Sequence, residues 1–113
     1  MHNAQLLKQL TASGDNSKCF ECGTSSPTWA SQTNAVFLCL QCSGTHRGLG
    51  VMKSFVKSCN LDNWSDREVQ FMVKGGNQRL RNFMKEYDIK EYFPAQMKYS
   101  FQALFYYRKM VKP

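Results

Sequence analysis

Four cysteines, arranged as two Cys-x-x-Cys pairs, are the residues whose type and spacing most directly imply chemistry. The pairs are Cys19/Cys22 and Cys39/Cys42, with 16 residues between them. A two-residue spacer lets a tight turn aim both sulfurs at one ion, and thiolates bind Zn²⁺ in a tetrahedron at about 2.3 Å. Two such pairs at this separation are typical of a structural zinc site. The alternative of two disulfides is typical of secreted chains. The N-terminus has no apolar stretch long enough for a signal peptide. We therefore predict one structural zinc ion, in a cytosolic or nuclear location.

Arg47 is the second candidate for chemistry, because it follows the last predicted ligand by five residues and is flanked by glycine. A zinc site would fix the backbone at Cys42, so the arginine would be held stiffly and project outward. An arginine presented in this way can enter a partner's phosphate site and neutralise developing charge. Two simpler interpretations stay open at this point: a surface arginine, or a clamp for nucleic-acid phosphates.

Two further residues receive structural interpretations. Four cysteines already complete a tetrahedron, so His46 is expected to be a hydrogen-bonded structural histidine rather than a fifth ligand. Cys59 lies outside the zinc spacing, and we interpret it as a small buried hydrophobe rather than a redox group. The sequence has no Gly-rich phosphate loop, paired catalytic carboxylates or Cys-His nucleophile pattern. We therefore expect no covalent chemistry from this chain alone.

The charge is basic, and it restricts the partner only loosely. The 113 residues carry a formal charge of +7, which zinc and four thiolates would reduce to about +5. This excess suits a nucleic acid, an anionic membrane or an acidic protein surface, and it equally suits a merely soluble surface. The longest apolar run, residues 35–40, is far too short to span a bilayer.

Hydrophobic periodicity predicts the elements that must position these side chains. We expect a helix over 4–12, a turn over 14–16, and a hairpin of strands 29–31 and 36–38 between the two cysteine pairs. A short helix or turn should follow the second pair, and then a strand over 54–58 whose residues alternate between two faces. A capping box at Ser65 and Glu68 should begin a helix that ends at Gly75-Gly76. Asn77 should cap the next helix, and Pro94 should begin a last one.

The first of these three helices should carry an apolar face of Val69, Met72 and Val73. The second should carry Leu80, Phe83, Met84 and Tyr87 at steps of three and four residues. The last helix should carry Met97, Phe101, Leu104, Phe105 and Arg108. The predicted fold class is α+β: a small zinc-ribbon-like sheet with the four-cysteine site, surrounded by about five helices. We expect one domain over 1–113, with a zinc module at about 16–50 and a helical part at about 60–113.

A long ordered motif closely resembles the ArfGAP zinc-finger domain, and nearest to it the subgroup that acts at the Golgi. The motif comprises Cys19-Phe20-Glu21-Cys22-Gly23, Pro27-x-Trp29-x-Ser31, residues 38–51 from Leu-Cys-Leu-x-Cys to His-Arg-Gly-Leu-Gly-Val, Ser54-Phe55-Val56, Leu61-Asp62-x-Trp64 and Gly75-Gly76-Asn77. The resemblance covers residues from about 6 to 110. It departs from the family pattern at Ala35, where the family has Gly, and at Met52, where it has His. These departures suggest a different hairpin turn and put a partner contact at Met52 in doubt.

The resemblance implies a GTPase-activating domain for an Arf-family small GTPase in its GTP-bound form. It implies that Arg47 is an arginine finger supplied in trans, that Trp29 orients it, and that Cys19, Cys22, Cys39 and Cys42 hold one structural zinc. The domain would have no nucleotide site of its own and would not be an enzyme by itself. It would regulate vesicle traffic, cytoplasmic and peripheral on Golgi membranes, with coat proteins and an anionic membrane surface as further possible partners. The alternative is a zinc-dependent nucleic-acid-binding module of the GATA type. We expect no nucleic acid, because no run of Lys and Arg follows the second cysteine pair.

Overall fold

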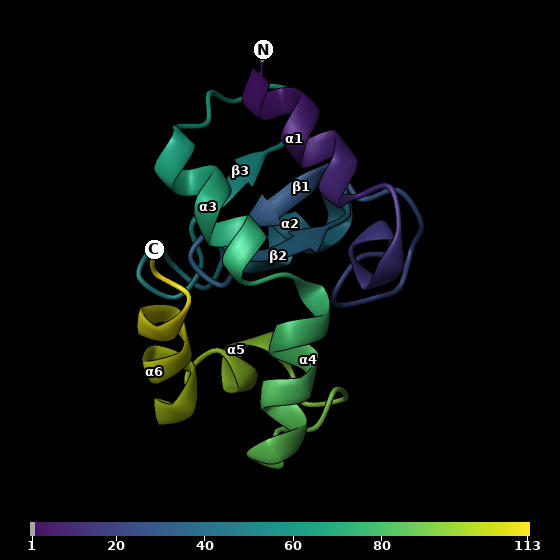
Figure 1. Ribbon diagram of the computed structural model, residues 1–113. Helices are drawn as coiled ribbons and strands as arrows, with labels where there is room; N and C mark the ends of the chain where they lie inside the picture. The colour runs from purple at the N-terminus through teal and green to yellow at the C-terminus, as the bar shows by residue number, and fades with distance from the viewer. Residues whose placement is uncertain (1) are drawn as a thin grey trace.

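A three-stranded antiparallel sheet lies at the centre of the computed structural model, which describes residues 2–113 (Figure 1). Its strands are β1 (Trp29–Ser31), β2 (Val36–Leu38) and β3 (Val56–Ser58), in the order β2-β1-β3. Trp29 pairs with Leu38 on one side and with Ser58 on the other. Strands β1 and β2 have the predicted bounds, so the hairpin between the two cysteine pairs is confirmed.

Strand β3 differs from its prediction in length and in burial. It is shorter than residues 54–58, and all three of its residues are buried instead of alternating. Lys57 can be buried because its ammonium donates to the Asn63 carbonyl and to a Glu68 carboxylate oxygen, the latter at 2.9 Å. A paired charge is the usual form in which lysine enters an interior. An alternation pattern cannot reveal such a partner, and this explains the error.

Six α-helices and one 3-10 helix surround the sheet within residues 2–113, where about five helices were predicted. Helix α2 (Leu40–Arg47) packs across all three strands, and α1 (His2–Leu10) packs on α3 (Asp66–Lys74). The 3-10 helix η1 (Gly14–Ser17) occupies the predicted turn and contacts α4 (Asn77–Glu86). Helices α4, α5 (Ala95–Lys98) and α6 (Gln102–Met110) lie at the other end of the molecule from α1 (Figure 1). The α+β class is confirmed. No helix in this range is both long and apolar enough to cross a membrane.

The junction between α3 and α4 confirms one capping prediction and corrects another. Ser65 and Glu68 form the reciprocal capping box at the start of α3. Asn77 is not the cap of α4: Gly76 takes that position, and Asn77 is the first helical residue. Its side chain turns inward instead. The amide oxygen accepts from the Phe37 N–H at 2.7 Å, and the amide nitrogen donates to the carbonyls of Asp15 and Lys18. Asn77 thus ties three segments together.

The predicted apolar faces are mostly but not wholly buried. In α3 and α4 the residues Val69, Met72, Leu80, Phe83 and Met84 are buried, whereas Val73 and Tyr87 are exposed. The single helix predicted from Pro94 is in fact α5 and α6, separated by residues 99–101. The break turns Tyr99 into the core, where it is fully buried. Met97 and Phe105 stay partly exposed as a result, and Arg108 points back toward the sheet.

The hairpin turn before β2 is shaped by a close contact with the α3–α4 junction. Ala35 is buried and has φ +56, a left-handed conformation that an L-residue rarely adopts. Its carbonyl accepts from the Gly76 N–H at 2.8 Å. A Cβ on Gly75 would lie 2.3 Å from the Ala35 Cβ, so only glycine fits at position 75. The Ala35 methyl group therefore fills the space that a side chain at position 75 would need.

Candidate functional site

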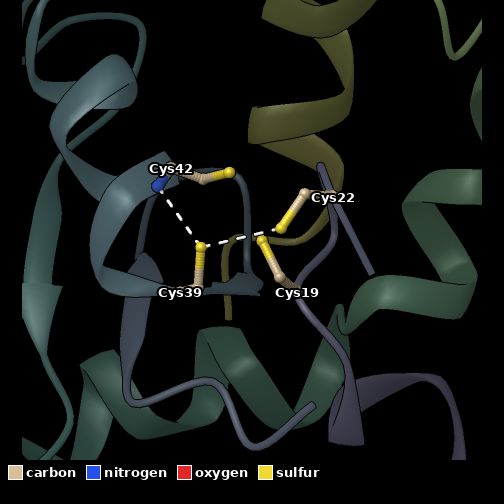
Figure 2. Close-up of side chains that lie close together, drawn as sticks. All are labelled: Cys19, Cys22, Cys39 and Cys42. Carbon is tan, nitrogen blue, oxygen red and sulfur yellow. Dashed lines mark hydrogen bonds between the residues drawn. The ribbon is translucent and has the colours of Figure 1, made fainter. Parts of the chain in front are cut away.

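The four predicted cysteines come together in one cluster (Figure 2). Their four Sγ atoms all lie within 4.8 Å of one another, and those of Cys22 and Cys39 are 3.7 Å apart. A tetrahedral zinc with Zn–S bonds of about 2.3 Å requires sulfurs about 3.8 Å apart. The donor set, its number and its spacing therefore fit one structural zinc ion with no open coordination position. Cys59 is buried and stands outside this cluster, as expected.

Two local structures aim these sulfurs. The first pair sits on a tight turn in which the Gly23 N–H donates to the Cys19 carbonyl at 2.9 Å. Gly23 has φ +79, which glycine adopts without strain. In the second pair Cys39 is the N-cap of α2, and its Sγ accepts from the Cys42 N–H at 3.4 Å. One cysteine pair thus closes a turn and the other begins a helix.

The thiols differ in their electrostatic surroundings. Hydrogen bonds from the hydroxyl and the backbone N–H of Thr24 lower the pKa of Cys22 to about 6. Burial raises the pKa of Cys42, and the neighbouring sulfurs raise it further. Four thiolates at this spacing repel one another, so a divalent cation is needed to keep them together.

Arg47 is the last residue of α2, and its side chain is exposed, as expected. Its guanidinium carbon lies 5.4 Å from the centre of the Trp29 ring. Within the described residues the guanidinium makes no hydrogen bond and no ion pair. Trp29, which the resemblance implies orients the arginine, therefore contacts it. The cation–π contact holds the charge near the sheet, and the donors of the guanidinium stay free to bind an anion.

Large apolar side chains are exposed along the same part of the chain. Leu40 lies two turns before Arg47 on the same face of α2, and Val51 and Met52 follow the helix. Their exposed fractions are 67%, 69% and 82%, respectively. We call these three residues the apolar rim. Exposed apolar side chains before and after Arg47 in the chain suit a protein surface better than a nucleic-acid backbone, whose contacts are mainly polar and charged.

His46 is buried and fully hydrogen-bonded, as predicted, but sequence reasoning missed its main partner. His46 Nε2 is 2.8 Å from Glu21 Oε2, and His46 Nδ1 is 2.8 Å from Ser54 Oγ. Burial alone raises the pKa of Glu21, but the hydrogen bond to His46 and the charge of Lys98 outweigh it and hold this pKa at about 2. Burial and Glu21 raise the pKa of Tyr99 well above its usual range, so its hydroxyl stays protonated and donates to Glu21 at 2.6 Å. The one signal in the sequence was the position of Glu21 between Cys19 and Cys22, where a carboxylate needs a partner.

Comparisons with known proteins agree with this site. Residues 4–111 match the ArfGap family model, described as "Putative GTPase activating protein for Arf". The chain is 43% identical over 93 residues to ADP-ribosylation factor GTPase-activating protein GCS1 of Saccharomyces cerevisiae, a match that covers 82% of this chain and 26% of the relative. It is 40% identical over 108 residues to ADP-ribosylation factor GTPase-activating protein 3 of Macaca fascicularis, covering 95% and 21%. The chain thus spans about a quarter or less of the length of these relatives.

Solved structures show the same fold. A crystal structure of a putative GTPase activating protein for ADP ribosylation factor from Cryptosporidium parvum superposes with a TM-score of 0.88 at 33% identity, covering 97% of this chain and 88% of the other. The ArfGap domain of HIV-1 Rev binding protein superposes with a TM-score of 0.70 at 25% identity, covering 96% and 81%. These matches do not favour the nucleic-acid-binding alternative. The family match spans nearly all of the chain and includes the cysteine cluster, so this chain belongs to the ArfGAP family.

Proposed function

We propose that this chain stimulates GTP hydrolysis by an Arf-family GTPase and that Arg47 is the arginine finger it supplies. The observation that carries the proposal is an exposed guanidinium with free donors at the end of a helix that begins inside a four-cysteine cluster. The partner would supply the nucleotide, the Mg²⁺ and the residue that orients the attacking water. Arg47 would stabilise the charge that develops on the transferred phosphoryl group, which is worth about 10³–10⁵ in rate.

Zinc would be held by Cys19, Cys22, Cys39 and Cys42, and it would act structurally because four sulfurs leave no site for substrate. The chain's own residues do the rest. The N-cap at Cys39 fixes the start of α2, and Trp29 restricts the guanidinium through its ring face. We propose that residues 1–113 act as one unit, because Arg108 of α6 donates to Asn34 in the hairpin turn at 2.9 Å.

The partner proposal is a GTP-bound Arf, approached through Arg47 and the apolar rim. The names of the relatives support this choice of GTPase. We further propose a peripheral position on Golgi membranes, where the basic net charge, about +5 with zinc bound, would favour an anionic lipid surface. Coat proteins are a second class of partner in this proposal. Co-sedimentation with vesicles of neutral and of anionic lipid tests the membrane contact directly.

A single-turnover phosphate-release assay with GTP-loaded Arf tests the main proposal. Arg47→Ala should lower the maximal rate by about 10³-fold or more while the zinc content and the circular dichroism spectrum stay unchanged. Arg47→Lys should stay severely impaired, because lysine lacks the planar fork of donors. Arg67→Ala is the matched control: Arg67 is exposed on α3 and should not affect the rate. An Arg47→Ala domain as active as the wild type would refute the assignment.

A further inference from the structure

A buried polar network connects the end of the last helix to the first cysteine pair, and it passes through the residue next to Arg47. Its four central residues are Asn34, Ser31, Ser54 and His46, and all are at most 2% exposed. Arg108 enters at one end and Glu21 leaves at the other. The distances along it are 2.9 Å from Arg108 to Asn34, 2.8 Å to Ser31, 2.7 Å to Ser54, 2.8 Å to His46 and 2.8 Å to Glu21.

The two charged ends give every hydrogen bond in this network the same direction. A guanidinium only donates, so the Asn34 oxygen must accept from Arg108 and its amide nitrogen must donate to Ser31. Glu21 accepts hydrogen bonds from the Lys98 ammonium and the Tyr99 hydroxyl, so it is the acceptor here too and His46 Nε2 must carry a hydrogen toward it. Ser31 then donates to Ser54, and Ser54 donates to a bare Nδ1 of His46. If Nδ1 also carried a hydrogen, it would donate to Ser54. Ser31 and Ser54 share one hydrogen bond, so one of their two hydroxyl hydrogens would then have no acceptor in the network.

We propose that this network positions Arg47, with Ser54 and His46 as its positioning residues. His46 is the residue before Arg47 in α2, so the two bonds to its ring fix the rotation of the helix end about its axis. The backbone after Arg47 is held by hydrogen bonds such as that from the Gly50 N–H to the Arg47 carbonyl at 3.2 Å, and the ring of His46 adds the side-chain anchor beside Arg47. The inference rests on the proposed function of Arg47 and adds what aims its side chain.

Ser54→Ala removes the hydroxyl that joins Ser31 to His46 and no other polar group of the network. The maximal rate of GTP hydrolysis at saturating domain should fall by about tenfold, since a misplacement of 1 Å can cost about 10²-fold. The domain concentration for half-maximal stimulation should change by less than about twofold, because the docking surface is unaltered. Ser58→Ala is the matched control: Ser58 is also buried and accepts two hydrogen bonds, from the N–H groups of Asn60 and Leu61. It should lose stability without losing maximal rate.

Two results would overturn the inference. One is a Ser54→Ala domain whose maximal rate stays within about twofold of the wild type; the other is an equal fall in Ser54→Ala and Ser58→Ala. If the wild type itself failed to stimulate hydrolysis, the proposed function would fall and the inference with it. A wild type that stimulates beside an equally active Ser54→Ala would overturn the inference alone.

The direction of the network has a spectroscopic signature that does not depend on activity. Long-range ¹H–¹⁵N correlation spectra distinguish the two histidine tautomers. The network requires His46 in the wild type to carry its hydrogen on Nε2, with Nδ1 accepting from Ser54. In Ser54→Ala the Nδ1 resonance should shift while the hydrogen on Nε2 stays in place. A wild-type His46 with its hydrogen on Nδ1 would contradict the proposed direction.

Discussion

Asn77→Ala should be among the most destabilising substitutions in this domain outside the zinc site. The side chain of Asn77 is fully buried. It accepts one hydrogen bond from the Phe37 N–H at 2.7 Å and donates two, to the Asp15 carbonyl at 3.1 Å and to the Lys18 carbonyl at 2.8 Å. Alanine removes all three bonds and supplies no new partner. Phe37 lies on β2, Asp15 lies in η1, and Lys18 directly precedes Cys19, so the substitution loosens three segments around the zinc site.

The expected magnitude follows from counting these groups. Three hydrogen bonds at roughly 1 kcal/mol each give about 3 kcal/mol. A buried group left without a partner costs more, on the order of 1–3 kcal/mol, unless water enters. Because water can partly replace the lost hydrogen-bond partners, we expect Asn77→Ala to lower the free energy of unfolding by about 3–5 kcal/mol. This is a large share of the ~5–15 kcal/mol that stabilises a typical domain.

Urea unfolding followed by circular dichroism and tryptophan fluorescence measures this loss. The free zinc concentration must be held constant, because a bound metal shifts apparent stability by mass action. Asn82→Ala is the matched control: Asn82 lies on the same helix, is exposed, and accepts one bond from Gln78 at 2.9 Å. It should stay within about 0.5 kcal/mol of the wild type. A loss below about 1 kcal/mol for Asn77→Ala would refute the reasoning from unsatisfied buried groups.

Three other perturbations have defined outcomes. Cys22→Ser should lose zinc and the folded circular dichroism spectrum, whereas Cys59→Ala should keep both; a folded, metal-free Cys22→Ser would contradict the zinc assignment. Burial raises the pKa of Glu68, but the capping serine and a nearby lysine outweigh it and lower this pKa overall. The stabilisation from Glu68 is therefore complete above its unfolded pKa of about 4.3 and is lost as pH falls. Glu68→Gln should destabilise less at pH 4 than at pH 7 in urea titrations, and an equal loss at both would count against the ion pair. Gly75→Ala should cost about 1–3 kcal/mol through its clash with Ala35, and Ala35→Gly should recover most of that loss in a double-mutant cycle; simple additivity would argue against the contact.

The parts of the fold that could be predicted from the sequence are those whose causes lie within a few residues. The capping box needs only Ser65 and Glu68, which are three positions apart. Each Cys-x-x-Cys pair places its two sulfurs through its own short spacer, and the hairpin strands lie between the two pairs. Such features can be predicted because both interacting residues lie within a few positions of each other in the chain.

The features that escaped prediction depend on partners far away in the chain. Asn77 was assigned to a helix cap because asparagine often caps, but its amide oxygen binds Phe37, 40 residues away. Arg108 was placed on an apolar helix face, and it donates to Asn34 across 74 residues. No periodicity in the chain encodes such pairings. Tertiary hydrogen bonds of this kind are visible only once the fold brings the two partners together.

Helix α2 has a consequence for how members of this family can diverge. Its eight residues are fewer than the roughly 12–15 that an isolated helix needs in water. Its order comes from packing on the three strands and from its two ends, where the sulfur of Cys39 and the ring of His46 make hydrogen bonds. Three positions between these ends are exposed and do not pack in the core: Gln41, Gly44 and Thr45. A Cβ added on Gly44 would meet no atom within 4 Å. Substitutions at these positions should therefore leave the fold unchanged, and under the proposed function they are where the docking surface can vary without moving Arg47.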